Sequence, residues 1–161
     1  MQVLVPLTDD IEWLEPDGLG GFASGTAVGR RTRRYHALLL TATSPPTGRY
    51  VLVNGFEAWI ETESGRVALS SQRYLPNMIS PDGERRLRSF SDDPWPRWIW
   101  QLDGGSQIEL ELFVPHDVSA CVLRWIVCGC VGGSLPPSFP ACCLRRLVMF
   151  DQLLARDHKR G

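Results

Sequence analysis

The sequence predicts an all-β protein, an antiparallel β-sandwich, and three observations lead to that fold class. The 15 glycines and 12 prolines separate short apolar stretches, as turn residues separate strands. One pair of apolar stretches alternates with polar residues around a glycine-rich turn, as the two arms of a β-hairpin do. Through residue 125, no segment of useful length has the apolar spacing of an amphipathic helix.

The clearest predicted element is a hairpin formed by residues 97–102 (RWIWQL) and 107–114 (QIELELFV). In the second arm every other residue is apolar, so one face is expected to be buried. The other face, with Glu109 and Glu111, is expected to be exposed to solvent. We expect Trp98 and Trp100 of the first arm to lie in the core.

Further strands are predicted on either side of this hairpin. The dipeptide Asn54-Gly55 interrupts one of them and indicates a turn or bulge. The four segments are residues 35–43, 50–61, 66–70 and 119–127.

Charge and hydropathy exclude several classes of protein. The chain has 17 basic and 18 acidic residues and no basic block before residue 126, so nucleic acid is not expected as a partner. No apolar run approaches the roughly 18–20 residues of a membrane helix, so no membrane association is expected. The first ten residues lack the basic start of a signal peptide, which predicts a cytoplasmic protein.

The composition changes after residue 127. Residues 1–127 are predicted to be a β-sandwich domain, and residues 128–161 an atypical tail that is irregular, or weakly helical over residues 144–155. Three interpretations of its cysteines stay open: a zinc site, a disulfide framework, and a segment that is translated out of frame or disordered. We favour the third, because the cysteines lack the usual zinc-ligand spacing, and we predict no metal or other cofactor. The tail's cysteines are Cys128, Cys130, Cys142 and Cys143.

A glycine-rich segment near the start indicates unusual backbone geometry. Such a density of glycine requires positive φ angles or close approach by another group. Gly18, Gly20 and Ala23 match a dinucleotide fingerprint, but no apolar strand precedes them and no helix follows, so no nucleotide is expected. The five glycines are Gly18, Gly20, Gly21, Gly25 and Gly29.

Polar residues with two possible roles follow these glycines: Arg30, Arg31, Arg33, Arg34, Tyr35 and His36. They could form a polar lip that binds sugar hydroxyls or orients carboxylates. Alternatively, they form a solvated turn whose arginines pair with Glu12, Glu15 and Asp17.

The six tryptophans could stack on sugar rings or fill a core. Trp98 and Trp100 are assigned to the core, and whether Trp125 is buried is left undecided. Trp13 or Trp59 is expected to lie nearer the glycine-rich segment. Trp95 lies between two prolines and is the best single candidate for exposure.

Three motifs follow one another near the start of the chain: residues 12–14 (EWL), 17–26 (DGLGGFASGT) and 32–39 (TRRYHALL). Their order resembles the start of the bacterial and archaeal type of glycogen debranching enzyme, and residues 45–52 and 113–116 are also similar to that family. The chain resembles the family over about residues 11–125. Asp17 stands where asparagine is commoner, and Ala37 stands where glycine is usual.

The resemblance implies a partial N-terminal β-sandwich domain that handles α-glucan in glycogen breakdown. In the family, a C-terminal α/α-barrel carries the amylo-α-1,6-glucosidase activity, and this sequence lacks it. A 4-α-glucanotransferase activity is sometimes ascribed to the N-terminal part. The implied partners are α-glucan and that catalytic domain. The implied contact residues are Trp13, Gly20, Gly21, Arg33, Arg34, Tyr35 and His36.

No catalytic residue is predicted, and the chain alone is expected to be inactive. Glycoside hydrolysis generally needs two carboxylates about 5–9 Å apart. Nothing in the sequence shows that any two of the candidates meet. The rival hypothesis is a self-contained, non-catalytic carbohydrate-binding or interaction module, which exposed and coplanar tryptophans would favour. The candidate carboxylates are Glu12, Glu15, Asp17, Glu57 and Asp117.

Overall fold

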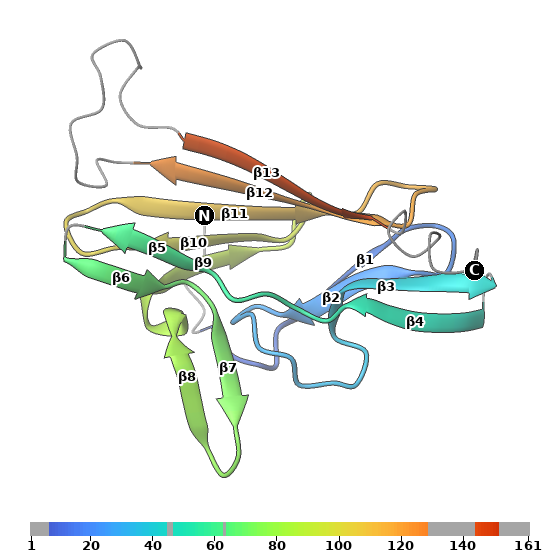
Figure 1. The fold of residues 1–161 in the computed structure, drawn as a ribbon, viewed down its shortest axis with the longest axis horizontal. Helices are drawn as coiled ribbons and strands as arrows, with labels where there is room; N and C mark the ends of the chain where they lie inside the picture. The colour runs from blue at the N-terminus through green and yellow to red at the C-terminus, as the bar shows by residue number, and fades with distance from the viewer. Residues whose placement is uncertain (1–6, 45–46, 63, 129–143, 152–161) are drawn as a thin grey trace, which may run out of the picture.

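Two antiparallel sheets pack on a shared apolar core (Figure 1). The computed structural model describes residues 7–44, 47–62, 64–128 and 144–151. The first sheet has the order β1-β2-β3-β4, with strands Glu12–Pro16, Phe22–Thr26, Ala37–Ser44 and Thr47–Val53. The second has the order β13-β12-β11-β10-β9, with strands Leu144–Asp151, Ala120–Cys128, Gln107–Phe113, Arg97–Gln101 and Leu87–Ser91. The predicted antiparallel β-sandwich is therefore confirmed.

Two separate hairpins connect the sheets along the chain. Strands β5 (Trp59–Thr62) and β6 (Gly65–Ala68) form the first. Strands β7 (Ser71–Tyr74) and β8 (Met78–Asp82) form the second, which projects from the body and leads into a 3-10 turn, Gly83–Arg86 (Figure 1). Leu75, in the loop between β7 and β8, is 94% exposed.

The core joins residues of the two sheets. Trp13 and Ala23 come from the first sheet and pack with Trp98 and Leu112 of the second. The Trp13 and Trp98 rings meet edge to face, with centroids 5.5 Å apart. Such aromatic pairs bury a large apolar area and prefer this geometry, so this pair is a principal contact between the sheets.

The predicted β10–β11 hairpin is confirmed. Trp98 pairs with Leu110 and Trp100 with Ile108 across the two strands, and all four side chains are buried. The placement of both tryptophans in the core is therefore correct.

The expectation for the opposite face of β11 is wrong at Glu111. This side chain is buried, and its carboxylate accepts a hydrogen bond from Arg124, the residue directly opposite it on β12. The arginine covers the carboxylate, and a buried charge is tolerated when it is paired in this way. Glu109 stays partly exposed, with Arg97 at 3.8 Å.

The other predicted strands are present with small shifts of their ends. The segment 50–61 is divided, as the Asn54-Gly55 dipeptide indicated: β4 ends at Val53 and β5 begins at Trp59. Sequence patterns missed β1 and β2, because Phe22–Thr26 consists mainly of small residues (FASGT) with no apolar alternation. They also missed the β7–β8 hairpin, whose residues are mostly exposed or half-buried.

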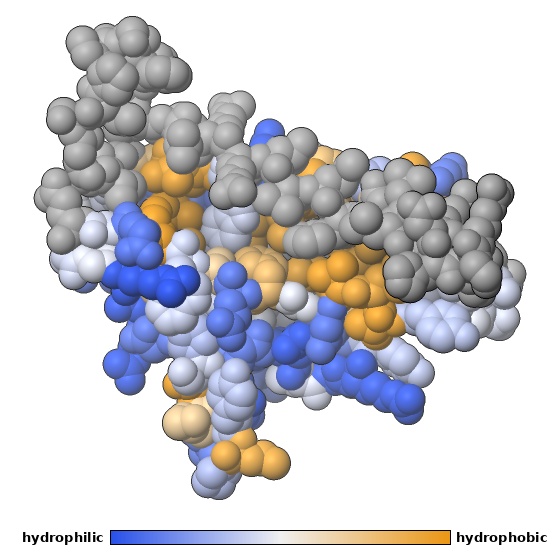
Figure 2. All heavy atoms as spheres, viewed as in Figure 1, coloured by the Kyte–Doolittle hydropathy of each residue, from blue (hydrophilic) through white to orange (hydrophobic). Residues whose placement is uncertain are grey.

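An exposed edge strand carries several apolar side chains. Strand β4 closes one side of the first sheet, and Tyr50, Val51 and Leu52 are all exposed on it. Figure 2 shows hydrophobic residues in this area and at the end of the β7–β8 hairpin. An unpaired edge of this kind favours pairing with another chain.

The tail differs in part from its expectation. Residues Leu144–Asp151 form β13, which pairs antiparallel with β12, rather than a weak helix. Cys130, Cys142 and Cys143 lie outside the described residues, so the interpretations of the cysteine cluster remain predictions.

Candidate functional site

The loop between β1 and β2 is a tight polar turn built around Asp17. Its carboxylate oxygen Oδ1 accepts hydrogen bonds from the backbone N–H groups of Leu19 (2.7 Å) and Gly21 (2.8 Å). Gly18 and Gly20 have φ angles of +78° and +93°, which L-residues with a side chain rarely adopt. The predicted need for glycine is confirmed here, and Asp17, buried in the turn, fixes its shape.

Two other glycines are required by close approach. A Cβ atom on Gly21 would lie 2.4 Å from Asp17 Oδ2 and 2.6 Å from the carbonyl oxygen of Leu40. A Cβ atom on Gly25 would lie 3.1 Å from the Trp13 ring. Gly18 and Gly20 therefore shape the loop. Gly21 and Gly25 let β2 pack against β3 and the core.

The loop between β2 and β3 is organised by His36. This imidazole is 5% exposed, and its Nδ1 atom accepts hydrogen bonds from the backbone N–H groups of Thr32 (3.1 Å) and Arg33 (3.3 Å). Its Nε2 atom lies 3.7 Å from Glu12 Oε1. Residue 36 therefore holds the loop from the inside rather than facing a ligand.

The charges beside His36 have opposite effects on its protonation. Burial lowers the pKa of His36, the neighbouring Glu12 carboxylate opposes this, and the Arg33 cation reinforces it. The hydrogen bond from Arg33 Nε, at 2.6 Å, lowers the pKa of Glu12. The neutral imidazole suits its role, because only an unprotonated Nδ1 can accept the two backbone hydrogen bonds.

The arginines of this loop have different partners. Arg30 pairs with Asp9 at 2.9 Å, Arg31 donates to Gln72 Oε1 at 3.2 Å, and Arg33 pairs with Glu12. Arg34 lies over the Tyr35 ring, 5.6 Å from its centroid. The turn interpretation is thus correct for the Arg33–Glu12 pair, whereas Asp17 binds backbone amides instead of arginine.

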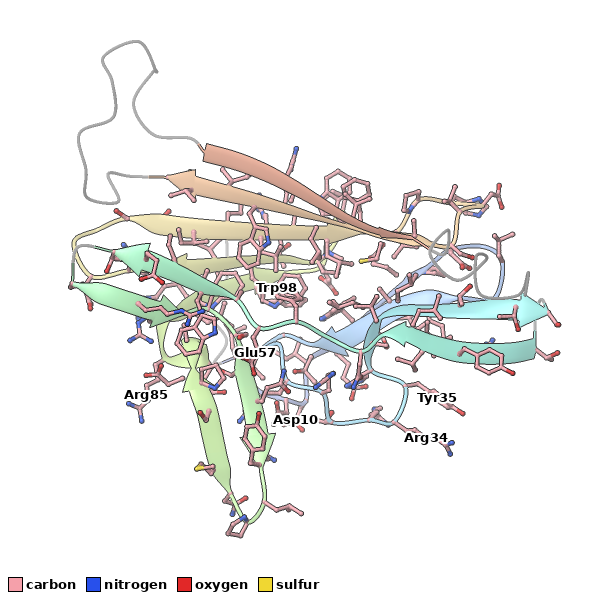
Figure 3. All side chains as sticks on the ribbon, viewed as in Figure 1. Asp10, Arg34, Tyr35, Glu57, Arg85 and Trp98 are labelled. Carbon is pink, nitrogen blue, oxygen red and sulfur yellow. The ribbon has the colours of Figure 1, made fainter. Side chains whose placement is uncertain are left out.

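Arg34 and Tyr35 form the most outward part of the predicted lip. Tyr35 is 52% exposed, and Figure 3 shows both side chains pointing away from the body. Gly20 is half-buried, and its carbonyl accepts a hydrogen bond from Arg49 Nε at 2.9 Å. Of the seven residues implied by the resemblance, Trp13, Gly21 and His36 are buried, and the other four reach the surface.

The tryptophans are distributed differently from the expectation. Trp59 is 40% exposed, with the Arg66 guanidinium 4.7 Å from its ring centroid. Trp95 is only partly exposed, because its ring packs on Phe113 at 5.8 Å. Trp125 is also half-buried and packs against Trp100. The candidate for exposure was therefore wrong: the β5–β6 hairpin, not the proline loop, presents a tryptophan to solvent.

Two polar clefts flank Arg73. The larger, of about 720 Å³, is lined by Glu12, Arg33 and Asp9, among others, and so includes part of the predicted lip. The smaller, of about 320 Å³, is lined by Arg31, Asn54, Gly55, Phe56, Glu57, Gln72, Arg73 and Tyr74. Both volumes lie in the range of small-ligand sites, which is roughly 300–1,000 Å³.

The candidate carboxylates are spread over separate surroundings. Glu12 lines the larger cleft and Glu57 the smaller one. Asp117 lies at the surface, with His116 Nδ1 at 3.0 Å. Burial, and then the charge of Asp92, raise the pKa of Glu15. Neither cleft therefore brings together two of the five candidate carboxylates, as an acid and base pair for glycoside hydrolysis requires, although Asp9 and Asp10 line the larger cleft beside Glu12.

Residues 72–74 were missed as candidates for a site, and no pattern in the sequence could have identified them. Gln72, Arg73 and Tyr74 belong to β7, and the chain brings them beside residues 54–57 and the loop after β2 only when it folds. Their side chains carry no local motif. A site assembled from three distant segments has no sequence spacing of its own.

Three further observations bear on the class of site. Among the described residues, no three histidine, cysteine or acidic side chains lie together as metal ligands. In the same part of the chain, no helix is long and apolar enough to cross a membrane. Cys121 is fully buried, and burial is the main cause that raises its pKa to about 12, so it acts as a small apolar residue.

Comparison with known proteins gives one match. Neither the curated proteins nor the solved structures include a significant match to this chain. The model of the family described as glycogen debranching enzyme N terminal matches residues 11–136, well over half of the chain. That range contains both loops, the smaller cleft, part of the larger cleft and every strand except β13. The chain therefore belongs to the family of glycogen debranching enzyme N-terminal domains.

Proposed function

We propose that this chain is the α-glucan-handling N-terminal part of a glycogen debranching enzyme, and that it acts in the cytoplasm in glycogen breakdown. The family match over residues 11–136 carries the proposal. On this proposal the catalytic chemistry of the parent enzyme, an amylo-α-1,6-glucosidase with or without a 4-α-glucanotransferase activity, belongs to another domain. The present domain binds and presents the glucan to that domain.

The structure supports this role through the form of the lip. Arg34 and Tyr35 offer a guanidinium and a phenol ring at the surface, and Arg33 lies at the wall of the larger cleft. Guanidinium N–H groups donate to sugar hydroxyls, and aromatic rings pack on the apolar C–H faces of sugars. We assign direct contact to these three residues. Gly20, Gly21, Trp13 and His36 then position the loops that carry them.

The separation of the candidate carboxylates Glu12 and Glu57 supports a role without hydrolysis by this chain alone. Glu12 is held by Arg33, and Glu57 lines a different cleft. The rival interpretation, a self-contained carbohydrate-binding module, gains no support from the tryptophans. Of the six, only Trp59 is exposed, and the other five are buried or half-buried.

Binding to glycogen tests the proposal. The chain is run on native gels with and without glycogen, and we expect glycogen to retard it. Combining Arg34→Ala with Tyr35→Ala should reduce the retardation several-fold, because both side chains are exposed and their loss leaves the core intact. The matched control is Arg85→Ala, which removes an exposed arginine on the other side of the molecule (Figure 3).

The same preparation is incubated with branched α-glucan, and released glucose and transferred chains are measured. We expect neither product. If glycogen does not retard the chain on the gel, the glucan-handling role is contradicted. Glucose release that a carboxylate substitution abolishes contradicts the assignment of the chemistry to another domain.

A further inference from the structure

The smaller cleft has a composition suited to a neutral ligand rich in hydroxyl groups. Asn54 and Glu57 lie in the segment between β4 and β5, Gln72 and Tyr74 on β7, and Arg31 in the loop after β2. Amides, carboxylate and guanidinium together supply donors and acceptors in planar pairs, which match the neighbouring hydroxyls of a sugar ring. Tyr74 is 47% exposed and adds an aromatic surface on which a sugar can pack.

Part of the cleft is fixed before any ligand binds. Arg31 Nη2 donates to Gln72 Oε1 at 3.2 Å, and Arg31 Nη1 lies so near Gly55 that a Cβ atom there would be 3.0 Å away. The guanidinium is thus held between the backbone of one segment and the side chain of another. A group held in this way loses little freedom on binding, which improves affinity.

Other polar groups of the cleft remain available to a ligand. Within the residues that the structure describes, the Asn54 amide, the Glu57 carboxylate and the Tyr74 hydroxyl make no hydrogen bond or ion pair with other residues. Figure 3 places Glu57 near the centre of the view, well apart from Arg34 and Tyr35. The cleft is therefore separate from the outward part of the lip.

The charges of the cleft favour a neutral ligand over an anion. Arg73 is already paired with Asp9 at 3.2 Å. The remaining guanidinium, Arg31, is balanced within the cleft by the Glu57 carboxylate. An anion such as phosphate would meet this carboxylate without a surplus of positive charge to compensate. A neutral polyol meets no such penalty.

The volume limits the size of what can bind. The cleft measures about 320 Å³, at the lower end of small-ligand sites. Arg31, Asn54, Gly55, Phe56 and Gln72 also line a cavity between the two sheets, but its volume of about 80 Å³ holds only two or three water molecules. The smaller cleft therefore has room for a sugar ring, and the cavity between the sheets does not.

We propose that the cleft formed by Arg31, Asn54, Glu57, Gln72 and Tyr74 is a second saccharide site, which takes one or two glucosyl units of an α-glucan chain. The inference rests on the proposed function for the identity of the sugar. It adds a site apart from Arg34 and Tyr35, the outward part of the lip, so that one glucan chain, or two branches, can contact the domain at two places.

The test is a titration of the full chain with maltotriose, followed by calorimetry or amide chemical shifts. Tyr74→Ala and Asn54→Ala should each weaken maltotriose binding about tenfold, the loss expected for about 1.4 kcal/mol of contact energy. Tyr74→Phe, which keeps the ring, should bind nearly as well as the wild type. The matched control is Tyr50→Ala, which removes an exposed tyrosine on β4. Thermal unfolding of each variant checks that the fold is intact.

The outcomes separate this inference from the proposed function. Weaker binding by the Tyr74 and Asn54 variants, but not by Tyr50→Ala, supports the cleft. If the wild type binds maltotriose and these two substitutions leave the affinity unchanged, the assignment of a saccharide site to the cleft is wrong. The proposed function is then unaffected. No binding of maltotriose or glycogen by the wild type overturns both. Binding of inorganic phosphate that the same substitutions abolish, or that displaces maltotriose, makes the cleft an anion site and overturns the inference.

Discussion

The β10–β11 hairpin and the glycine-rich segment from Asp17 to His36 hold their shapes by different means. The hairpin buries Trp98 and Trp100 in the core between the sheets. The glycine-rich segment instead depends on hydrogen bonds from backbone amides to Asp17 and His36. Apolar burial therefore stabilises the sandwich, and buried polar side chains shape the loops that reach the proposed glucan. The two regions should respond differently to substitution.

The largest effect is expected in the hairpin. Trp98→Ala removes the edge contact with Trp13, the packing on Phe90 at 5.2 Å, and a hydrogen bond from Nε1 to the carbonyl of Ala27. We expect the free energy of unfolding to fall by about 3–5 kcal/mol, measured by urea denaturation. Trp98→Phe, which keeps part of the ring contacts, should lose less.

The control for this prediction is the exposed tryptophan. Trp59→Ala should change the free energy of unfolding by less than about 1 kcal/mol, because Trp59 is exposed and lies outside the core cluster. Equal losses for the two alanine variants would contradict the assignment of Trp98 to the contact between the sheets.

A smaller effect is expected at the tight turn. Gly21→Ala places a methyl group against Asp17 Oδ2 and the Leu40 carbonyl, so the turn and strand β3 must separate. We expect a loss of about 1–3 kcal/mol in the free energy of unfolding. Weaker glycogen binding should accompany it, because the loops that carry the lip shift.

A glycine in open space provides the comparison for Gly21. Gly65 has a φ of +116°, but a Cβ atom added there would meet no other atom within 4 Å, so Gly65→Ala adds backbone strain alone. It should leave glycogen binding unchanged. If Gly21→Ala were as well tolerated as a surface substitution, the close approach to Asp17 would not shape the turn.

The smallest effect concerns pH. Burial lowers the pKa of His36 below its ordinary value of 6.5, so the unfolded chain binds a proton more readily at this residue. The stability that neutral His36 contributes is complete above pH 6.5 and is lost as pH falls through the lowered pKa. Between pH 7 and 5, His36→Gln should therefore show a flatter decline of unfolding free energy than the wild type. Glu12, with its lowered pKa, stays ionised in this range.

The matched control is His116→Gln, which removes an imidazole whose side chain is 76% exposed. It should retain the wild-type decline. A His36→Gln variant with the same slope as the wild type would show that His36 does not hold the loop as a neutral acceptor.

The contrast between the two regions also explains what the sequence could predict. Residues 107–113 alternate in polarity because one face of β11 is buried, so the hairpin and its core residues were identified correctly. Glu111 was misassigned, since alternation cannot show that Arg124 on the next strand covers it. The glycines indicated a special backbone, but not that β2 is a core strand. His36 resembles a polar surface residue until its backbone partners are known.

The smaller cleft could not be predicted from the sequence. Asn54 and Glu57 were visible as a turn residue and a carboxylate, whereas Gln72 and Tyr74 carried no signal. Their meeting depends on how the β7–β8 hairpin and the segment after β4 pack against the loop after β2. Tertiary packing, not local pattern, creates the site.

The most direct test of the glucan-handling account is a map of amide chemical shifts in the wild-type chain as maltoheptaose is added. The account predicts saturable shifts in residues 31–35, 54–57 and 72–74, with the β10–β11 hairpin unchanged. The account is contradicted if none of these three segments shows a shift, or if the shifts are confined to parts of the sheets away from the three segments.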